Sequence, residues 1–160
     1  MSIKVGDKLP DATFMEMTSD GPQPRTTADV FGGKTIALFA VPGAFTPTCS
    51  ARHLPGFIDK ADEFKGKGVD EIVCTSVNDV FVMGAWGKSA SAGETVRMLA
   101  DGNGAFASAV GLELDGTGFG MGKRSQRYSM LVKDGVVAEL NVEQGPEFKV
   151  SSADYLLGQL

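Results

Sequence analysis

The segment from residue 34 to residue 77 limits the folds open to this sequence more than any other part. Two short apolar runs, KTIALFAV (34–41) and VDEIVCTSV (69–77), have the composition of strands that are buried on both faces. Between them, apolar side chains recur at helical spacing: Leu54, Phe57, Ile58, Ala61 and Phe64. Strand, helix and strand of these lengths form a βαβ unit, in which the two strands are parallel.

Further helices and strands are expected around this unit. Three more helices are predicted, at 79–89 with Asp79 as the N-cap, at 106–110 and at 151–157. Three more strands are predicted, at 96–100, 128–132 and 136–142. The last two are joined by Lys133-Asp134-Gly135, a hairpin signal, so parallel and antiparallel pairs share the sheet. The pattern predicts an α/β protein of thioredoxin-like fold, with a mixed central sheet flanked by helices.

Composition excludes several classes of protein. The length of 160 residues fits one domain over residues 1–160. A net charge of −5 argues against nucleic acid or an anionic membrane as the partner. Two cysteines and one histidine are too few for a disulfide scaffold or a Cys/His zinc site. Because we find neither a secretory signal nor a membrane-spanning run, we expect a cytoplasmic protein with reduced thiols.

The segment VPGAFTPTC (41–49) carries the strongest functional signal. It leaves a buried strand, turns and enters a helix, and ligand sites of α/β sheets lie at such strand ends. Thr46 fits the N-cap and Pro47 the first helical position, which places Cys49 in the first turn. Unpaired N–H groups and the helix dipole favour a thiolate there. The alternative is that Cys49 is a small buried apolar side chain. Cys74 lies within an apolar strand and is expected to be structural.

His53 lies one helical turn after Cys49 and allows three interpretations. As a cation it would favour the Cys49 thiolate, and as a neutral base it would form a hydrolytic Cys-His pair. The third interpretation is a histidine that bonds to local backbone or to a neighbouring side chain. Pro55 cannot donate a backbone hydrogen bond, so we expect a kink or bulge here and hypothesise that the first turn can unwind.

The stretch GLELDGTGFGMGK (111–123) is rich in glycine but matches neither common phosphate-binding motif. We therefore expect a mobile loop. A basic cluster of Lys123, Arg124 and Arg127 follows, and Arg127 stands at the start of a predicted strand. This cluster is either a solvated loop end or, for Arg127, a group that holds a thiolate or a bound oxyanion.

Several motifs in the same order resemble those of the peroxiredoxins, in the type II or peroxiredoxin-5-like form. They are PGAFTPTCS, HLPGF, SVND, FVMGAW and RSQRYSMLVKDG. The resemblance implies a thiol peroxidase in which Cys49 is the peroxidatic cysteine and becomes a sulfenic acid. It also implies that Thr46 hydrogen-bonds the peroxide, that Arg127 stabilises the thiolate and the developing negative charge, and that Pro42 shields the pocket. No metal or organic cofactor is implied.

The resemblance also suggests partners. The substrates would be hydrogen peroxide and alkyl hydroperoxides. The C-terminal region NVEQGPEFKVSSADYL contains no cysteine, so an external thiol, from glutaredoxin with glutathione or from thioredoxin, would reduce the sulfenic acid. Members of the family usually form homodimers, and Phe45, Phe81 and Trp86 are either interface or core residues here.

Two other functions use the same cysteine. One is a cysteine hydrolase built on Cys49 and His53, which needs an orienting residue and an oxyanion hole that the sequence does not reveal. The other is a redox sensor or holdase that passes its oxidation to a partner protein. Turnover of peroxide with a thiol donor distinguishes the peroxidase from both.

Overall fold

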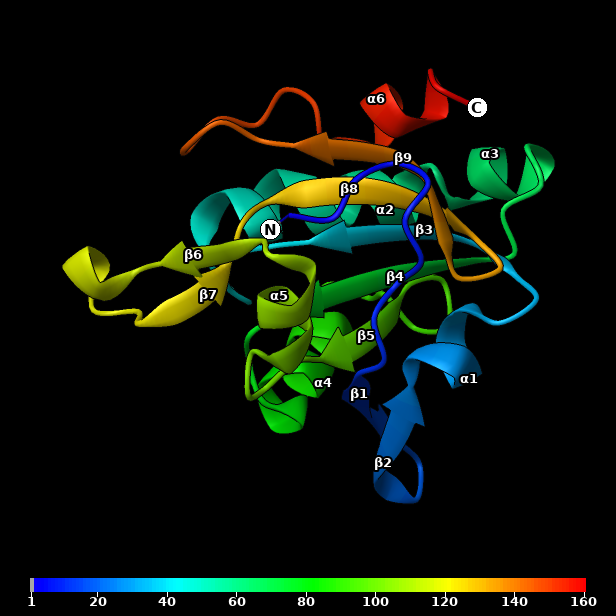
Figure 1. Cartoon of the computed structure of the whole chain (residues 1–160). Coiled ribbons are helices and arrows are strands. Elements are labelled where there is room, and N and C mark those ends of the chain that lie inside the picture. Colours follow the sequence, from blue (N-terminus) through cyan, green and yellow to red (C-terminus); the bar gives the residue numbers. More distant parts are fainter. Residues whose placement is uncertain (1) are drawn as a thin grey trace.

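The computed structural model describes residues 2–160 and is built on a seven-stranded sheet (Figure 1). The strand order is β2-β1-β5-β4-β3-β8-β9. The strands are β1 (Thr13–Thr18), β2 (Gly21–Thr26), β3 (Thr35–Ala40), β4 (Glu71–Ser76), β5 (Arg97–Ala100), β8 (Tyr128–Lys133) and β9 (Val136–Val142). β3, β4 and β5 are parallel to one another, while β8 lies antiparallel on the other side of β3. The predicted mixed sheet and its βαβ unit are confirmed.

Helices cover both faces of this sheet. They are α1 (Thr27–Phe31), α2 (Leu54–Asp59), α3 (Ala61–Gly66), α4 (Val80–Ser89), α5 (Ala105–Val110) and α6 (Ala153–Leu157), with a π-helical turn at Cys49–His53. Side chains of α2, α3, α4 and α6 pack into one apolar layer, and those of α1 and α5 pack into the other. Across residues 2–160, every helix is too short or too polar to cross a membrane.

The two faces follow from the alternation of side chains along the central strands. In β3, Ala37 and Phe39 point to the layer of α2 and α4, while Ile36 and Leu38 point to the layer of α1 and α5. All four are fully buried. This strand, which is apolar from Ile36 to Ala40, is therefore covered on both sides, as the sequence predicted.

The N-terminal hairpin of β1 and β2 was missed by the sequence analysis. Its second strand reads GPQPRT, and two prolines argue against a strand. β2 lies at the edge of the sheet, where Pro22 and Pro24 stand opposite Met17 and Met15 of β1. In a strand, residues two apart point their backbone nitrogens to the same side. Both prolines of β2 therefore place the nitrogen that lacks a hydrogen on the side away from β1, where no strand pairs with it.

Two expectations need correction. The predicted helix after residue 54 is divided at Lys60, whose backbone (φ −98°, ψ 8°) is not helical. The glycine-rich stretch 111–123 is not simply a loop, because it contains β6 (Glu113–Asp115), paired with β7 (Lys123–Ser125). This hairpin projects from the body of the molecule (Figure 1). Gly120 and Gly122 have φ of 71° and 66°, which supplies the left-handed turn that closes it.

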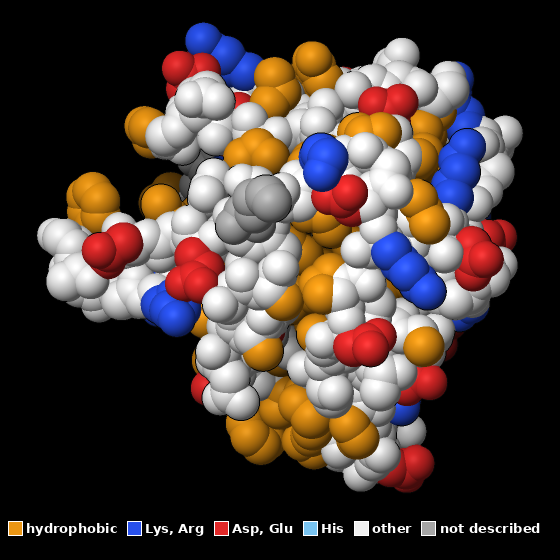
Figure 2. Space-filling view, viewed as in Figure 1, with side chains coloured by type: hydrophobic (Ala, Val, Ile, Leu, Met, Phe, Trp, Pro, Cys, Tyr) orange, Lys and Arg blue, Asp and Glu red, His pale blue; other side chains and the backbone are white. Residues whose placement is uncertain are grey.

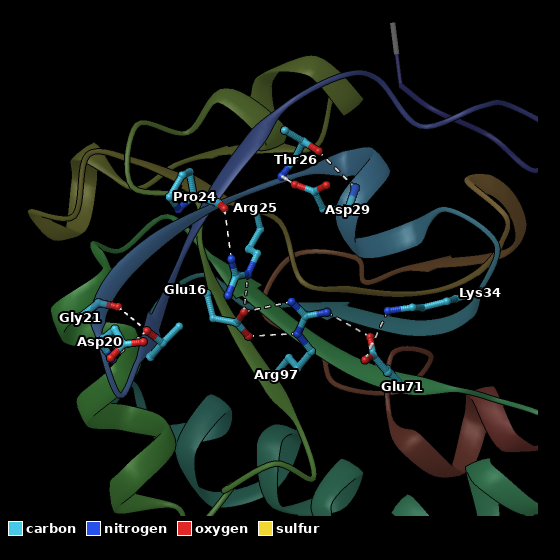
Figure 3. Close-up of polar contacts among 11 residues, drawn as sticks. Glu16, Asp20, Gly21, Pro24, Arg25, Thr26, Asp29, Lys34, Glu71 and Arg97 are labelled. Atoms are coloured by element: carbon cyan, nitrogen blue, oxygen red, sulfur yellow. Dashed lines mark hydrogen bonds and ion pairs between the residues drawn. The ribbon is translucent and has the colours of Figure 1, made fainter.

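An ion network ties four strands together along the face that α1 covers (Figure 3). The carboxylate of Glu16 on β1 accepts hydrogen bonds from Arg25 Nε at 3.0 Å and from Arg97 Nε and Nη2 at 3.0 and 2.9 Å. Arg97 on β5 also donates to Glu71 on β4 at 3.1 Å, and Lys34 lies 3.6 Å from Glu71. Burial alone would raise the pKa of Glu16, but the hydrogen bonds and charges of Arg97 and Arg25 outweigh it and lower that pKa.

We expect Glu16→Gln to lower the free energy of unfolding by about 2 kcal/mol at pH 7, because two arginines lose their charged acceptor. The pKa of Glu16 in the folded protein lies below the ordinary 4.5. Its contribution is therefore complete above pH 4.5 and disappears as the pH falls through the folded value. Denaturant titrations should show the gap between wild type and variant narrowing below pH 4. Glu94→Gln, at an exposed position, is the control and should show no gap at either pH.

Candidate active site

Cys49 lies where the sequence placed it, in the first turn of the helical segment that follows β3. Its side chain is fully buried. Pro47 occupies the first helical position, and Thr46 stands directly before it. Thr46 therefore holds the predicted N-cap position, and its hydroxyl donates to the Gly43 carbonyl at 2.7 Å. This bond closes the loop between β3 and the helix and leaves lone pairs of the Thr46 oxygen free to accept another hydrogen bond.

The turn that carries Cys49 is a π-helix, Cys49–His53. It ends where the Leu54 N–H donates to the Cys49 carbonyl, five residues back. The next residue, Pro55, has no N–H to continue the ladder, so the expected bulge is confirmed. The indole of Trp86 on α4 donates to Ser50 Oγ at 2.9 Å and fixes the turn from the side.

Arg127 reaches Cys49 because of the way two neighbouring strands pair. β8 runs antiparallel to β3, with Tyr128 opposite Ala40. The residue before β8 therefore lies beside the end of β3, from which the chain leads to Cys49. Arg127 Nη2 donates to the Cys49 sulfur at 3.0 Å. The guanidinium charge thus lies directly against the sulfur.

His53 is held by both of its ring nitrogens. Nε2 lies 2.8 Å from the Ser151 carbonyl oxygen and Nδ1 lies 2.9 Å from Arg127 Nη1. A carbonyl only accepts and a guanidinium only donates, so Nε2 carries the proton and Nδ1 is the acceptor. Burial, followed by the charge of Arg127, lowers the pKa of His53 to about 3. Of the three interpretations, the structure supports the histidine that bonds to backbone and to a neighbour.

Pro42, Gly43 and the β6–β7 hairpin border the site. Pro42 is half-buried. A Cβ on Gly43 would lie 3.1 Å from Thr46 Cγ2 and 3.3 Å from Met121 Cε, so glycine allows the hairpin to approach the loop. Arg124 Nη1 donates to the carbonyl of Val77 at 3.1 Å, which ties the hairpin to the loop after β4.

The members of the basic cluster differ in their surroundings, and so do the two cysteines. Lys123 is exposed and pairs with Glu113, whereas Arg127 enters the site. Cys74 is fully buried in β4, as predicted, and both thiols are unpaired. Burial, and secondly the charge of Cys49, raises the pKa of Cys74, so it resists ionisation.

A second set of residues at the site was missed by the sequence analysis. Ser151 supplies the carbonyl that fixes His53, and Phe148 packs its ring edge-on to the imidazole with centroids 4.9 Å apart. The guanidinium carbons of Arg52 and Arg127 lie 4.7 and 5.8 Å from the centre of the same ring. Phe148 and Ser151 come from an irregular segment about one hundred positions after Cys49, and no sequence motif indicates that this segment contacts His53.

No group of three or more histidine, cysteine, aspartate or glutamate side chains within residues 2–160 is arranged to hold a metal ion. At the site, the Arg127 guanidinium donates to the Cys49 sulfur at 3.0 Å. The Thr46 hydroxyl, three positions before Cys49 in the sequence, is bonded to the Gly43 carbonyl.

Comparisons with known proteins agree with this chemistry. The family described as Redoxin matches residues 4–157. Peroxiredoxin-2B of Arabidopsis thaliana is 51% identical over 159 residues, covering 99% of this chain and 98% of that protein. The chain belongs to the peroxiredoxins. Hybrid peroxiredoxin hyPrx5 of Haemophilus influenzae is 46% identical over 163 residues, and the matched region covers all of this chain and 67% of that protein. The crystal structure of reduced Prx3 in complex with H2O2 from Vibrio vulnificus has a TM-score of 0.94 at 52% identity, with 98% of each chain covered.

The resemblance drawn from the motifs and the thioredoxin-like fold are thereby confirmed. Peroxiredoxins are thiol peroxidases, and this peroxiredoxin is related over nearly its whole length to the type II forms of plants and bacteria.

The depressed pKa of His53 makes the stability of this peroxiredoxin dependent on pH. The unfolded chain binds a proton at His53 below about pH 6.5, while the folded protein does so only near pH 3. The contribution of neutral His53 is complete above pH 6.5 and is lost as the pH falls toward 3. We expect His53→Gln, which keeps a donor and an acceptor, to lose less stability between pH 7 and pH 5 than the wild type. Denaturant titrations at the two pH values measure this, and equal losses would contradict it.

Proposed function

We propose that this peroxiredoxin reduces hydrogen peroxide and alkyl hydroperoxides through a sulfenic acid on Cys49. The observation that carries the proposal is the 3.0 Å contact between Arg127 Nη2 and the Cys49 sulfur, in the first turn of a helix. A thiolate is the reactive form of cysteine, and both features stabilise it. Cys74 is unsuited to this role, because burial raises its pKa.

In the proposed reaction, the Cys49 thiolate attacks one peroxide oxygen and the O–O bond breaks. Cys–S⁻, ROOH and a proton give Cys–SOH and ROH, so sulfur is oxidised by two electrons and the peroxide is reduced by two. Negative charge develops on the departing oxygen. Arg127, whose Nη2 donates to the sulfur, provides N–H donors beside it that stabilise the negative charge on the departing oxygen.

In this proposal Thr46 orients the peroxide and Pro42 shields the pocket. The Thr46 hydroxyl donates its proton in a hydrogen bond to the Gly43 carbonyl. Its oxygen is therefore available to accept a hydrogen bond from the peroxide O–H. Pro42 is half-buried beside this loop and shields the thiolate from water. The groups are held before the substrate arrives, which reduces the entropy that the reaction must lose.

The hydrolase alternative is much less compatible with the same geometry. A hydrolytic pair needs His53 to remove a proton from Cys49. Both nitrogens of His53 are occupied, one by Ser151 and the other by Arg127. A histidine whose pKa is about 3 is also a weak base at neutral pH.

We propose that an external thiol, from glutaredoxin with glutathione or from thioredoxin, restores the enzyme. One thiol converts Cys–SOH into a mixed disulfide and water, and a second thiol releases Cys49 as the thiol. Because Cys49 is fully buried, a protein thiol reaches it only if its turn unwinds. In this proposal the π-helical turn Cys49–His53 unwinds, because Pro55, just after it, has no N–H to bond back to it. Two unpaired cysteines fit a reducing compartment, and we propose the cytoplasm.

Peroxide turnover should depend on Cys49 alone of the two cysteines. We expect Cys49→Ser to abolish turnover of hydrogen peroxide and of an alkyl hydroperoxide, since a serine hydroxyl is not ionised at neutral pH. Cys74→Ala is the matched control and should keep most of the rate. NADPH consumption measured in parallel with complete glutaredoxin and thioredoxin systems identifies the reductant.

Three outcomes would contradict the proposal. Turnover that survives in Cys49→Ser excludes Cys49 as the nucleophile. A disulfide between Cys49 and Cys74 after one equivalent of peroxide, detected by mass spectrometry, excludes the external thiol. Stoichiometric oxidation without turnover, with every donor, would favour the redox sensor.

We further propose a homodimer formed through the aromatic side chains near the site. Phe45 and Phe81 are 53% and 66% exposed, and hydrophobic side chains gather over α4 at the bottom of Figure 2. Trp86 is buried with its ring 6.5 Å from that of Phe45, so it supports this surface from the core. Exposed aromatic groups of this size favour an interface.

We expect sedimentation velocity of the reduced protein to show a dimer. Phe81→Asp should shift it to a monomer, because a charge at the centre of an apolar interface is costly to bury. Tyr155→Asp, at an exposed position on α6, is the control and should remain dimeric. A monomeric wild type would contradict the proposal.

A further inference from the structure

We propose that Glu143 is a positioning residue that fixes His53, and through it Arg127, in the arrangement required by the Cys49 thiolate. This inference rests on the proposed function of Cys49. It concerns a carboxylate that touches none of the reacting atoms, and it explains why the segment after β9 takes the form that it has.

The Glu143 carboxylate organises that segment around a single oxygen. Oε2 accepts hydrogen bonds from the backbone N–H groups of Lys149, Val150 and Ser151 at 2.8, 2.9 and 2.8 Å. The Ser151 hydroxyl donates to the same oxygen at 2.6 Å. Three consecutive N–H groups directed at one point form a concave anion site in the backbone, here filled by a side chain of the same protein.

The charge on Glu143 matters to this arrangement. Burial acts to raise the pKa of Glu143, but the Ser151 hydroxyl and the three N–H groups outweigh it and lower that pKa. The group is therefore ionised at neutral pH. A neutral amide oxygen is a weaker acceptor than a carboxylate, and it cannot hold four donors equally well.

Glu143 is also joined to Arg127 through the backbone. The Glu143 N–H donates to the Arg127 carbonyl at 2.9 Å, next to the first pair of the β8–β9 ladder. The same residue thus anchors the main chain of Arg127 and the loop that faces its side chain.

The consequence for the site passes through Ser151. Its N–H and hydroxyl are held by Glu143, and its carbonyl accepts from His53 Nε2 at 2.8 Å. That bond places the imidazole proton on Nε2 and leaves Nδ1 free to accept from Arg127 Nη1 at 2.9 Å. In the other tautomer two donors would face each other, and the Arg127 guanidinium would lose this anchor.

A neutral anchor serves Arg127 better than a charged one. A carboxylate in direct contact with the guanidinium would offset its charge and weaken its effect on the Cys49 sulfur. His53 supplies the hydrogen bond without that offset, since its pKa is about 3. Glu143 keeps its own charge on the backbone N–H groups of the loop, so it directs the imidazole without pairing with Arg127.

The test compares Glu143→Gln with Glu147→Gln in the full-length protein. Glu147 lies in the same loop, is half exposed and pairs with Lys149, which makes it a matched control. We expect Glu143→Gln to lower the rate constant for Cys49 oxidation by hydrogen peroxide about tenfold, the size of one hydrogen bond to a charged group. The Cys49 thiolate fraction at pH 7, measured by ultraviolet absorbance, should fall as well. Cys74 does not interfere, because its pKa is raised.

The tautomer of His53 provides a readout that loss of stability alone would not change. The chain has one histidine, so its ring nitrogens can be assigned in a nitrogen-15 NMR spectrum without ambiguity. We expect one tautomer, protonated on Nε2, in the wild type and in Glu147→Gln. Glu143→Gln should show signals of both tautomers.

Ser151→Ala is the second variant, in case Glu143→Gln fails to fold. It removes one of the four donors, keeps the carbonyl and should change the rate and the tautomer in the same direction by a smaller amount. The proposal is overturned if the tautomer and the thiolate fraction stay as in wild type in a folded Glu143 or Ser151 variant. A wild type that shows the single tautomer but no peroxide turnover would instead contradict the proposed function.

Discussion

The antiparallel pairing of β3 with β8 is the constraint on which the rest of the site depends. It sets the start of β8 beside the end of β3, so Arg127 lies next to the helix that begins after β3 although 78 positions separate it from Cys49. The two strands pair along their whole length and are buried from Ile36 to Ala40 and from Tyr128 to Val132, which specifies this register strongly. A charge and a nucleophile are thereby held together by the core itself rather than by a flexible loop.

Around this contact, each neighbouring group is held by a hydrogen bond that also determines its chemical state. His53 anchors Arg127 as a neutral acceptor, because its other nitrogen donates to the Ser151 carbonyl. Thr46 is held by Gly43 and keeps its oxygen available as an acceptor. These bonds hold Arg127, His53 and Thr46 in fixed orientations around the loop and the turn that follow β3. The π-helical turn Cys49–His53 is held less firmly than these groups, because Pro55 after it has no N–H to donate back to the turn.

The two ends of the sheet have different tasks. At one end, charged and polar groups surround a single buried sulfur and support chemistry. Toward the other, Glu16, Arg97 and Glu71 alternate in charge across β1, β5 and β4 and join the N-terminal hairpin to the parallel strands (Figure 3). The edge strand β2 of that hairpin pairs through its backbone on one side only, and the bond from Arg25 to Glu16 adds a side-chain link to β1.

By itself, the sequence determined the βαβ unit, the place of Cys49 at a helix start, the bulge near Pro55 and the buried state of Cys74, because each depends on local pattern. The motifs also led to Arg127 and to the family. Only the tertiary structure decided which nitrogen of His53 carries the proton, and that Ser151 and Phe148 contact this histidine. Those features depend on contacts between segments about one hundred positions apart, and the irregular loop that makes them has no periodicity to reveal its fold. The same reason explains why the edge strand β2 and the β6–β7 hairpin were missed: their stability comes from their neighbours rather than from their own residues.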